Sequence, residues 1–153
     1  MSTLPFLDLK AINAAHRAEL LQAFERVLDS GWYVLGQEVA AFESEYAQWC
    51  GAGHAVGVAN GLDALVLALR ALGIGAGDEV IVPSNTYIAT WLAVSHVGAM
   101  PVPVEPDPRT FNLDPARIAA AITSRTRAVL PVHLYGQPAD MKAILDIAQR
   151  HRL

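Results

Sequence analysis

The sequence predicts an α/β fold in which helices flank a mainly parallel sheet. Two observations lead to this prediction. Short apolar runs of strand length alternate with longer segments whose apolar residues recur at helical spacing, from residue 54 to the end of the chain. Successive strands joined by helices run parallel, because a right-handed crossover returns the chain to the same end of the sheet.

The composition predicts one packed domain. The chain has 153 residues, of which 53% are hydrophobic and only 17% are charged. This balance excludes a disordered chain, and a chain of this length supplies one core rather than two. We therefore expect residues 1–153 to form a single unit, with N-terminal helices over residues 1–50 and a sheet-containing part over residues 51–153.

Charge and residue usage exclude several classes of function. The net charge is −4 and the cations are scattered, which argues against a nucleic-acid partner. No apolar run approaches the roughly 20 residues of a membrane span. The N-terminus also lacks a secretory signal, so we expect no membrane partner and a cytoplasmic location. A single cysteine cannot form an internal disulfide, and the five histidines lack metal-ligand spacing.

Two helices are predicted near the N-terminus. Apolar residues at helical spacing predict the first helix between Asp8 and Gly31. The second helix starts near Val39 and is stopped by the glycines at 51 and 53. Trp32 and Tyr33 lie in the loop between the two helices. They either close on a substrate, which makes Tyr33 a candidate substrate-binding residue, or pack between the helices, which is the favoured interpretation.

The elements that follow alternate along the chain. We expect strands over residues 54–59, 79–82, 100–105 and 127–132. We expect helices over residues 62–72, 86–97, 111–121 and 139–151. The last helix follows a strand and should lead into another strand, yet the sequence stops at Leu153. We therefore expect this chain to be part of a larger fold.

The turn before the helix at 62–72 is a candidate anion site. Gly61, Leu62 and Asp63 follow a predicted strand and open the helix, so their backbone amides point toward the sheet edge, where a phosphate can bind. The alternative, favoured on local sequence alone, is that Asn60 caps the helix and Asp63 stabilises its first turn. The nearby glycines do not have dinucleotide-binding spacing, and a Walker motif is absent.

Two further segments follow strands and should lie at the same edge, where ligands bind in open α/β sheets. The first, residues 83–87, contains Tyr87, whose ring either lies against a flat aromatic cofactor or extends its hydroxyl into solvent. The second, residues 133–138, begins with His133. A hydrogen-bonded histidine at a strand end is the favoured interpretation there, and no nucleophile stands at catalytic-triad spacing.

Five motifs in order carry a resemblance that spans essentially the whole chain. They occupy residues 30–36, 59–65, 77–90, 110–115 and 131–140. Together they closely resemble the DegT/DnrJ/StrS family of pyridoxal-phosphate sugar aminotransferases. The amino-acid sequence of the second and third motifs is most similar to that of the branch that aminates the C-3 ketone of nucleotide-linked 6-deoxyhexoses.

The resemblance implies a type I fold of pyridoxal-phosphate-dependent transferases. Residues 51–153 would form part of its large, cofactor-binding domain, with the C-terminal remainder absent. The amides of Gly61, Leu62 and Asp63 would help bind the phosphate of pyridoxal 5′-phosphate, and Tyr87 would stack on the pyridine ring. Many family members have threonine where Leu62 stands, so this chain would depend more on backbone amides.

The resemblance also implies groups that this chain does not contain. The family uses an Asp that keeps the pyridine nitrogen protonated and a Lys that forms the internal Schiff base. The only lysines here, Lys10 and Lys142, lie outside the motifs. The Schiff-base lysine is therefore expected beyond Leu153, no catalytic residue is assigned, and the chain alone is expected to be inactive.

The complete protein would transfer an amino group, from an amino-acid donor such as glutamate, to a nucleotide-linked ketosugar, and it would act as a homodimer. Two alternatives stay open. One is a dehydratase of the same family, in which the Schiff-base lysine is replaced. The other is a non-enzymatic product of a truncated gene.

Overall fold

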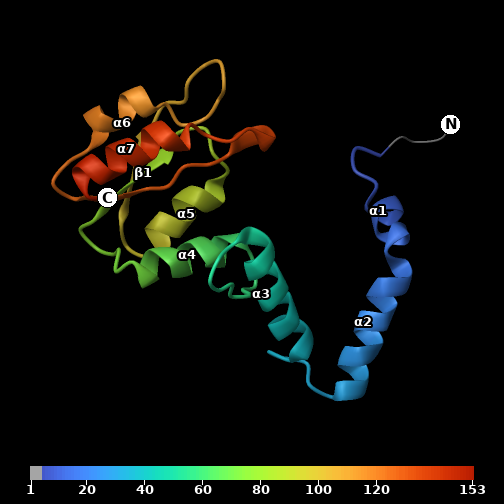
Figure 1. Ribbon diagram of the computed structural model, residues 1–153. Helices are drawn as coiled ribbons and strands as arrows, with labels where there is room; N and C mark the ends of the chain where they lie inside the picture. Colours follow the sequence, from blue (N-terminus) through green and yellow to red (C-terminus); the bar gives the residue numbers. More distant parts are fainter. Residues whose placement is uncertain (1–4) are drawn as a thin grey trace. The chain divides into compact units, whose positions relative to one another are not determined.

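The computed structural model describes residues 5–153 (Figure 1). The chain divides into two compact units, the first ending at Gly57 and the second spanning Val58–Leu153. Each unit is described by itself. The organisation of residues 1–153 as one domain stays a prediction.

The first unit contains three helices, α1 (Leu9–Ala15), α2 (Arg17–Ser30) and α3 (Gln37–Cys50). The prediction of one continuous helix between Asp8 and Gly31 is wrong. The helix breaks at His16, which leaves helical geometry (φ −108°, ψ 12°) and donates its backbone N–H to the Asn13 carbonyl in a tight turn. The predicted ends are confirmed, because Asp8 caps α1 and Gly31 ends α2 in the left-handed region at φ 65°.

The second predicted helix is confirmed as α3. It begins after Gly36 and ends at Gly51, which adopts φ 66°. An ion pair connects α2 and α3: the Arg26 Nε donates to Glu38 Oε1 at 2.6 Å. Few side chains of this unit are buried among the described residues, and α2 exposes the apolar side chains of Leu20, Leu21, Phe24 and Leu28.

The predicted strand over residues 54–59 is wrong. This segment is extended but pairs with no described strand, and Val56 is exposed. The Gly57 N–H, which a strand would use in a ladder, donates instead to the Glu43 carboxylate at 2.6 Å. An apolar run becomes a strand only where a partner satisfies its backbone groups, and the described chain supplies none here.

The second unit is built on a three-stranded parallel sheet. The strands are β1 (Glu79–Pro83), β2 (Met100–Val104) and β3 (Thr126–Val129), in the order β2-β1-β3. The helices are α4 (Gly61–Ala71), α5 (Ile88–His96), α6 (Pro115–Ala121) and α7 (Met141–His151), with a short 3₁₀ turn η1 (Leu134–Gly136). The predicted α/β class and parallel sheet are confirmed.

The central strand β1 has two buried faces. Val80 and Val82 pack into an apolar cluster with α4 and α5, whereas Ile81 packs into a second cluster with α6 and α7. This alternation follows from the two-residue period of a strand. Figure 1 shows the same layering, with α6 and α7 on one side of β1 and α4 and α5 on the other. The step from β1 to β2 and the step from β2 to β3 run in opposite directions, so right-handed crossovers place α5 and α6 on opposite faces.

Two predicted bounds differ from the structure for local reasons. The helix predicted from residue 111 starts only at Pro115, because Phe111 has a positive φ of 59° and Asp114 caps the helix at Ala116. The strand predicted over residues 127–132 ends at Val129, soon before Pro131, which has no N–H to extend the ladder. Among the described residues, no helix is both long and apolar enough to cross a membrane.

A buried carboxylate ties the amino end of β1 to the chain before β3. Glu79 is 4% exposed, accepts a hydrogen bond from the Thr123 hydroxyl and pairs with Arg125, whose Nε lies 2.9 Å from Oε1. The Thr123 hydrogen bond, and then that of Arg125, hold the pKa of Glu79 below its ordinary value. A carboxyl with a lowered native pKa stabilises the fold above its unfolded pKa of about 4.3, and loses that contribution as the pH falls through the native value.

Glu79→Gln is therefore expected to lower the melting temperature at pH 7. The difference from the wild type should shrink as the pH falls from about 4.3 through the lower native pKa of Glu79, because the wild-type carboxylate becomes protonated over that range. Thermal melts between pH 7 and pH 3 measure this. Glu38→Gln is the matched control, since its ion pair with Arg26 is exposed and contributes little. A Glu79→Gln difference that stays constant across this range would contradict the assignment.

Candidate functional site

The loops after the three strands meet at one edge of the sheet. Pro83 at the end of β1 pairs with Val104 at the end of β2, and β3 runs parallel on the other side of β1. The segments that follow, residues 84–87, 105–114 and 130–138, therefore gather at the carboxyl edge. This brings Tyr87 and the loop containing His133 to the same end of the sheet.

The N-terminus of α4 lies at this edge as well. The C-terminal ends of α4 and α5 meet where the strands begin: a Cβ on Gly75 would lie 3.5 Å from the Val97 carbonyl oxygen, and one on Gly98 would lie 3.6 Å from the Ala76 nitrogen. The eleven residues of α4 span about 16 Å, roughly the length of β1. Gly61 thus starts α4 near the end at which α5 starts.

Asn60 and Asp63 form a reciprocal cap on α4. The Asp63 N–H donates to Asn60 Oδ1 at 2.9 Å, and Asn60 Nδ2 donates to Asp63 Oδ2 at 2.9 Å. The capping interpretation of this turn is therefore confirmed. The amides of Gly61 and Leu62 come before the first intrahelical bond, and a Cβ on Gly61 would meet no atom within 4 Å. These two amides have no intrahelical acceptor and remain available to an anion, whereas the Asp63 amide would join them only by leaving Asn60.

Tyr87 is the N-cap residue of α5 and adopts extended geometry (φ −63°, ψ 145°). Its side chain is 78% exposed, so the ring is not part of the core. The backbone around it is held by its neighbours: Thr86 and Thr90 hydroxyls bond at 2.9 Å, and Trp91 Nε1 donates to the Pro83 carbonyl at 3.2 Å. An exposed ring on a fixed backbone is available to stack on a ligand.

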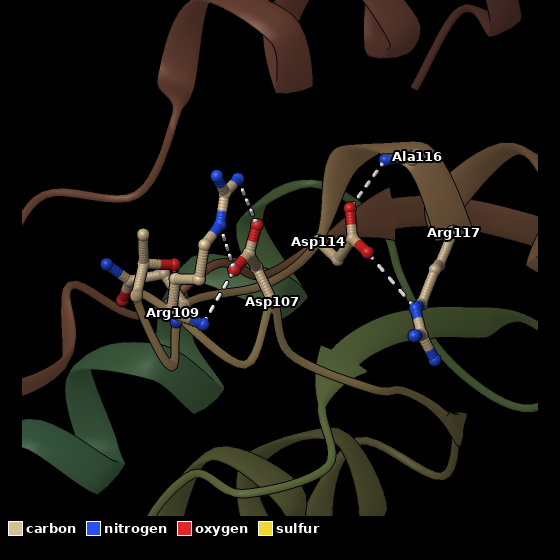
Figure 2. A network of polar contacts seen from close by, with 7 residues as sticks. Asp107, Arg109, Asp114, Ala116 and Arg117 are labelled. Carbon is tan, nitrogen blue, oxygen red and sulfur yellow. Dashed lines mark hydrogen bonds and ion pairs between the residues drawn. The ribbon is translucent and has the colours of Figure 1, made fainter.

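Charged pairs stiffen the loop after β2. Figure 2 shows Asp107 bound to Arg109 and Asp114 bound to Arg117. The hydrogen bonds from the Arg109 side chain hold the pKa of Asp107 below its ordinary value. Asp114 also caps α6 by accepting from the Ala116 N–H at 2.9 Å. Each of these guanidinium groups is matched by a carboxylate, so this loop is a braced turn rather than a free basic surface.

Asn112 is a residue whose position the sequence did not reveal. Its side chain is 3% exposed and bonds to three backbone groups of the loop after β3: the N–H of Leu134 and the carbonyls of Gln137 and Pro138. Within that loop, the Ala139 N–H donates to His133 Nδ1 at 3.0 Å. The hydrogen bond predicted for His133 is confirmed, but the residue lies beyond the end of β3, directly before the 3₁₀ turn η1.

Tyr33 lies in the first unit, in the loop between α2 and α3. Trp32 and Tyr33 are 67% and 66% exposed, so the prediction that they pack between the helices is wrong. Trp32 Nε1 donates to the Val34 carbonyl instead, which closes the loop on itself. Substrate binding by Tyr33 stays a prediction.

A hollow of about 510 Å³ lies away from this edge, between β3 and α7. Its lining is mainly apolar and includes Val129, Ile144 and Leu153. The described residues also contain no group of three or more His, Cys, Asp and Glu side chains that could hold a metal ion. The open amides of α4 and the exposed Tyr87 ring make the carboxyl edge the best-formed candidate site.

Comparison with known proteins assigns the chain to a family. The sequence profile of the DegT/DnrJ/EryC1/StrS aminotransferase family matches residues 14–153. The chain belongs to this family. A dTDP-3-amino-3,4,6-trideoxy-alpha-D-glucose transaminase from Streptomyces venezuelae is 63% identical over 149 residues, which are 97% of this chain and 39% of the relative. A dTDP-3-amino-3,6-dideoxy-alpha-D-galactopyranose transaminase from Aneurinibacillus thermoaerophilus is 59% identical over 98% of this chain and 41% of the relative.

Solved structures of family members share the fold. The crystal structure of DesV from S. venezuelae has a TM-score of 0.98 and 61% identity, and covers 100% of this chain and 41% of that one. The structure of NtdA from Bacillus subtilis with bound cofactor PMP has a TM-score of 0.95 and 36% identity, over 100% of this chain and 35% of that one. The chain thus spans about two fifths of the length of the curated relatives it matches.

Proposed function

We propose that this chain is the N-terminal, cofactor-binding part of a pyridoxal-phosphate-dependent sugar aminotransferase. The complete enzyme transfers an amino group from an amino-acid donor such as glutamate to the C-3 ketone of a nucleotide-linked 6-deoxyhexose. The observation that carries the proposal is the match of 63% identity to a transaminase whose name specifies a dTDP-linked 3-amino sugar. A second relative, 59% identical, is named for another dTDP-3-amino sugar.

The carboxyl edge has the features that pyridoxal 5′-phosphate requires. The cofactor has an anionic phosphate at one end and a flat aromatic ring at the other. The Gly61 and Leu62 amides at the start of α4 have no intrahelical acceptor and suit the phosphate, since a helix N-terminus favours negative charge. The exposed ring of Tyr87 suits the flat end. The residues present therefore fit the cofactor.

In this mechanism the cofactor supplies an electron sink for the amino-transfer chemistry. The residues of this chain bind and orient it. The amides of Gly61 and Leu62 would donate to the phosphate, while Asn60 holds the Asp63 carboxylate by its Nδ2 group, turned back toward the cap. The Tyr87 ring excludes water from one face of the site. The proton-transferring lysine and the pyridine-binding Asp belong to the remainder of the family fold.

The proposal includes a homodimeric enzyme in the cytoplasm. The exposed apolar residues of α2, Leu20, Leu21, Phe24 and Leu28, would be covered by the remaining polypeptide or by the partner subunit. Tyr33, also exposed, would contribute to the sugar-nucleotide site.

A chimera tests the proposed function directly. The matching segment of the S. venezuelae transaminase is replaced by this chain, so that the relative supplies the rest of the fold. The chimera is expected to form the relative's amino sugar from its ketosugar and an amino donor. Mass spectrometry of the sugar nucleotide measures this product. A folded, cofactor-loaded chimera that transfers no amino group would contradict the proposal.

Tyr87→Ala in this chimera is expected to weaken cofactor retention by about 0.5–1.5 kcal/mol, the usual contribution of an aromatic stack beyond lost contact area. The ring is exposed, so its removal should leave the melting temperature of the apo form nearly unchanged. Absorbance titration with pyridoxal phosphate measures the affinity, and Tyr87→Phe, which keeps the ring, is the control. An unchanged affinity beside a collapsed apo melt would make Tyr87 a packing residue.

A further inference from the structure

Three loops at the carboxyl edge are joined through two adjacent residues, Phe111 and Asn112. Asn112 Oδ1 accepts from the Leu134 N–H at 2.9 Å, and its Nδ2 donates to the Gln137 carbonyl at 3.0 Å and to the Pro138 carbonyl at 3.3 Å. One buried side chain thus binds the backbone at the start of the η1 turn and directly after it. A buried amide with its donors and acceptor satisfied fixes its partners strongly, because an unpaired polar group there is costly.

The side chain of Asn112 connects loops that follow strands on opposite sides of the sheet. Asn112 belongs to the loop after β2, while its partners follow β3, and the two strands lie on opposite sides of β1. The loop after β1 joins the same point, since Asn85 Nδ2 donates to the Phe111 carbonyl at 3.0 Å. Asn85 stands two residues before Tyr87. Asn85 is therefore connected to Asn112 through one hydrogen bond and one peptide unit, and Tyr87 follows two residues later.

The backbone conformations at these bonds agree with a fixed arrangement. Phe111 and Tyr135 have positive φ angles of 59° and 54°, in the left-handed region that residues with side chains rarely adopt. Such conformations persist where the surrounding contacts determine them. The Phe111 carbonyl accepts from Asn85, and Tyr135 lies between two residues bonded to Asn112, Leu134 and Gln137.

We infer that Asn112 is a positioning residue of the cofactor site. It holds the loops after β1 and β3 in one arrangement, so that the Tyr87 ring faces the cofactor and the His133 loop closes the adjacent rim. The bond from the Ala139 N–H to His133 Nδ1 requires that nitrogen to be unprotonated, which leaves the ring proton on Nε2. The inference rests on the proposed function for the identity of the ligand, and on the hydrogen bonds above for the arrangement.

Two substitutions separate positioning from general stability. Asn112→Ala removes all three bonds, whereas Asn112→Asp keeps the shape and the acceptor for Leu134 but removes the donors to Gln137 and Pro138. Amide hydrogen exchange is expected to lose protection at Leu134 in the alanine variant and to keep it in the aspartate variant. Both variants should change the His133 ring nitrogen signals, which report the tautomer, while the amides of Ile81 in the core stay protected. If the Asn112→Ala variant does not fold, the isosteric Asn112→Asp variant alone tests the inference.

Asn85→Ala is the matched control at the same edge. It removes the bond to Phe111 only, so it should loosen residues 84–87 and leave the Leu134 amide and the His133 signals unchanged. Pyridoxal phosphate, titrated into the 153-residue chain and followed by fluorescence, gives the functional readout. Asn112→Ala is expected to raise the dissociation constant about 2- to 10-fold, the equivalent of one net hydrogen bond.

The outcomes distinguish this inference from the proposed function. Loosened loops with weaker cofactor binding support the positioning role. Exchange and ring signals that match the wild type in both Asn112 variants overturn it, and so does an unchanged dissociation constant with loosened loops, while the proposed function stands. Failure of the wild-type chain to bind pyridoxal phosphate in a saturable manner removes the cofactor site assigned to this chain, and the positioning role with it, while amino transfer by the chimera tests the proposed function separately.

Discussion

Borohydride reduction of this chain with pyridoxal phosphate is expected to leave no stoichiometric pyridoxyllysine. The two lysines, Lys10 on α1 and Lys142 on α7, are exposed. A Schiff-base lysine is activated by a desolvated pocket or a neighbouring cation, and an exposed helix surface offers neither. A complete family enzyme, which forms the adduct with its own lysine, should be fully labelled. This chain should show only trace labelling.

Peptide mass spectrometry after reduction measures this labelling. The control is the same reaction in urea, because random modification of exposed amines should be similar in the folded and unfolded chain. A stoichiometric adduct on Lys10 or Lys142 in the folded chain alone would show that this segment carries its own amine for the cofactor. The division of roles between this chain and the rest of the family fold would then be wrong.

Ile81→Ala is expected to lower the free energy of unfolding by about 2–5 kcal/mol, as replacing a buried isoleucine by alanine generally does. Ile81 is fully buried at the centre of β1 and packs with Leu113, Ile118 and Ile144. These neighbours come from the loop after β2 and from both helices of that face, so a cavity there weakens the sheet that holds the candidate site.

Urea titration followed by circular dichroism measures this loss. Ile81→Val is the graded control, with an expected loss of about 0.5–1.5 kcal/mol, since it removes a single methylene. Equal midpoints for the wild type and the alanine variant would mean that Ile81 is not at the centre of the core.

The alternation of apolar runs with helical patterns was sufficient to predict the class and most of the second unit. β1, β2 and the four helices α4 to α7 form close to their predicted ranges, because each has either a partner strand or an apolar cluster to pack against. Glycine and capping signals also worked well. Gly31, Gly51 and Asp114 end or start helices where their residue types favour it.

The two errors near the N-terminus have different causes. Residues 54–59 have the composition of a strand, but no described strand pairs with them, and the Gly57 amide bonds to a side chain instead. The break at His16 interrupts an apolar pattern that continues through it, so periodicity alone cannot reveal it. The first case shows that a local pattern sets a preference and that a tertiary hydrogen bond decides the result.

The candidate site was predicted in part. Gly61, Leu62 and Tyr87 were accessible to sequence reasoning because each follows a strand or opens a helix, a position where ligands commonly bind. Asn112 was not, since its role depends on bonds to Leu134, Gln137 and Pro138 more than twenty residues away. The only sequence signal was its place in a motif, which by itself does not say whether the amide packs, caps or binds.

The central claim is that the start of α4 and the Tyr87 ring form a binding site for pyridoxal phosphate. A titration of the ¹⁵N-labelled chain with pyridoxal phosphate, observed by NMR, tests it most directly. Saturable shifts are expected at the Gly61 and Leu62 amides and at Tyr87, with much smaller shifts when pyridoxal, which lacks the phosphate, is used. Shifts confined to the surroundings of Lys10, Lys142 or the hollow between β3 and α7, with the carboxyl edge unchanged, would contradict it.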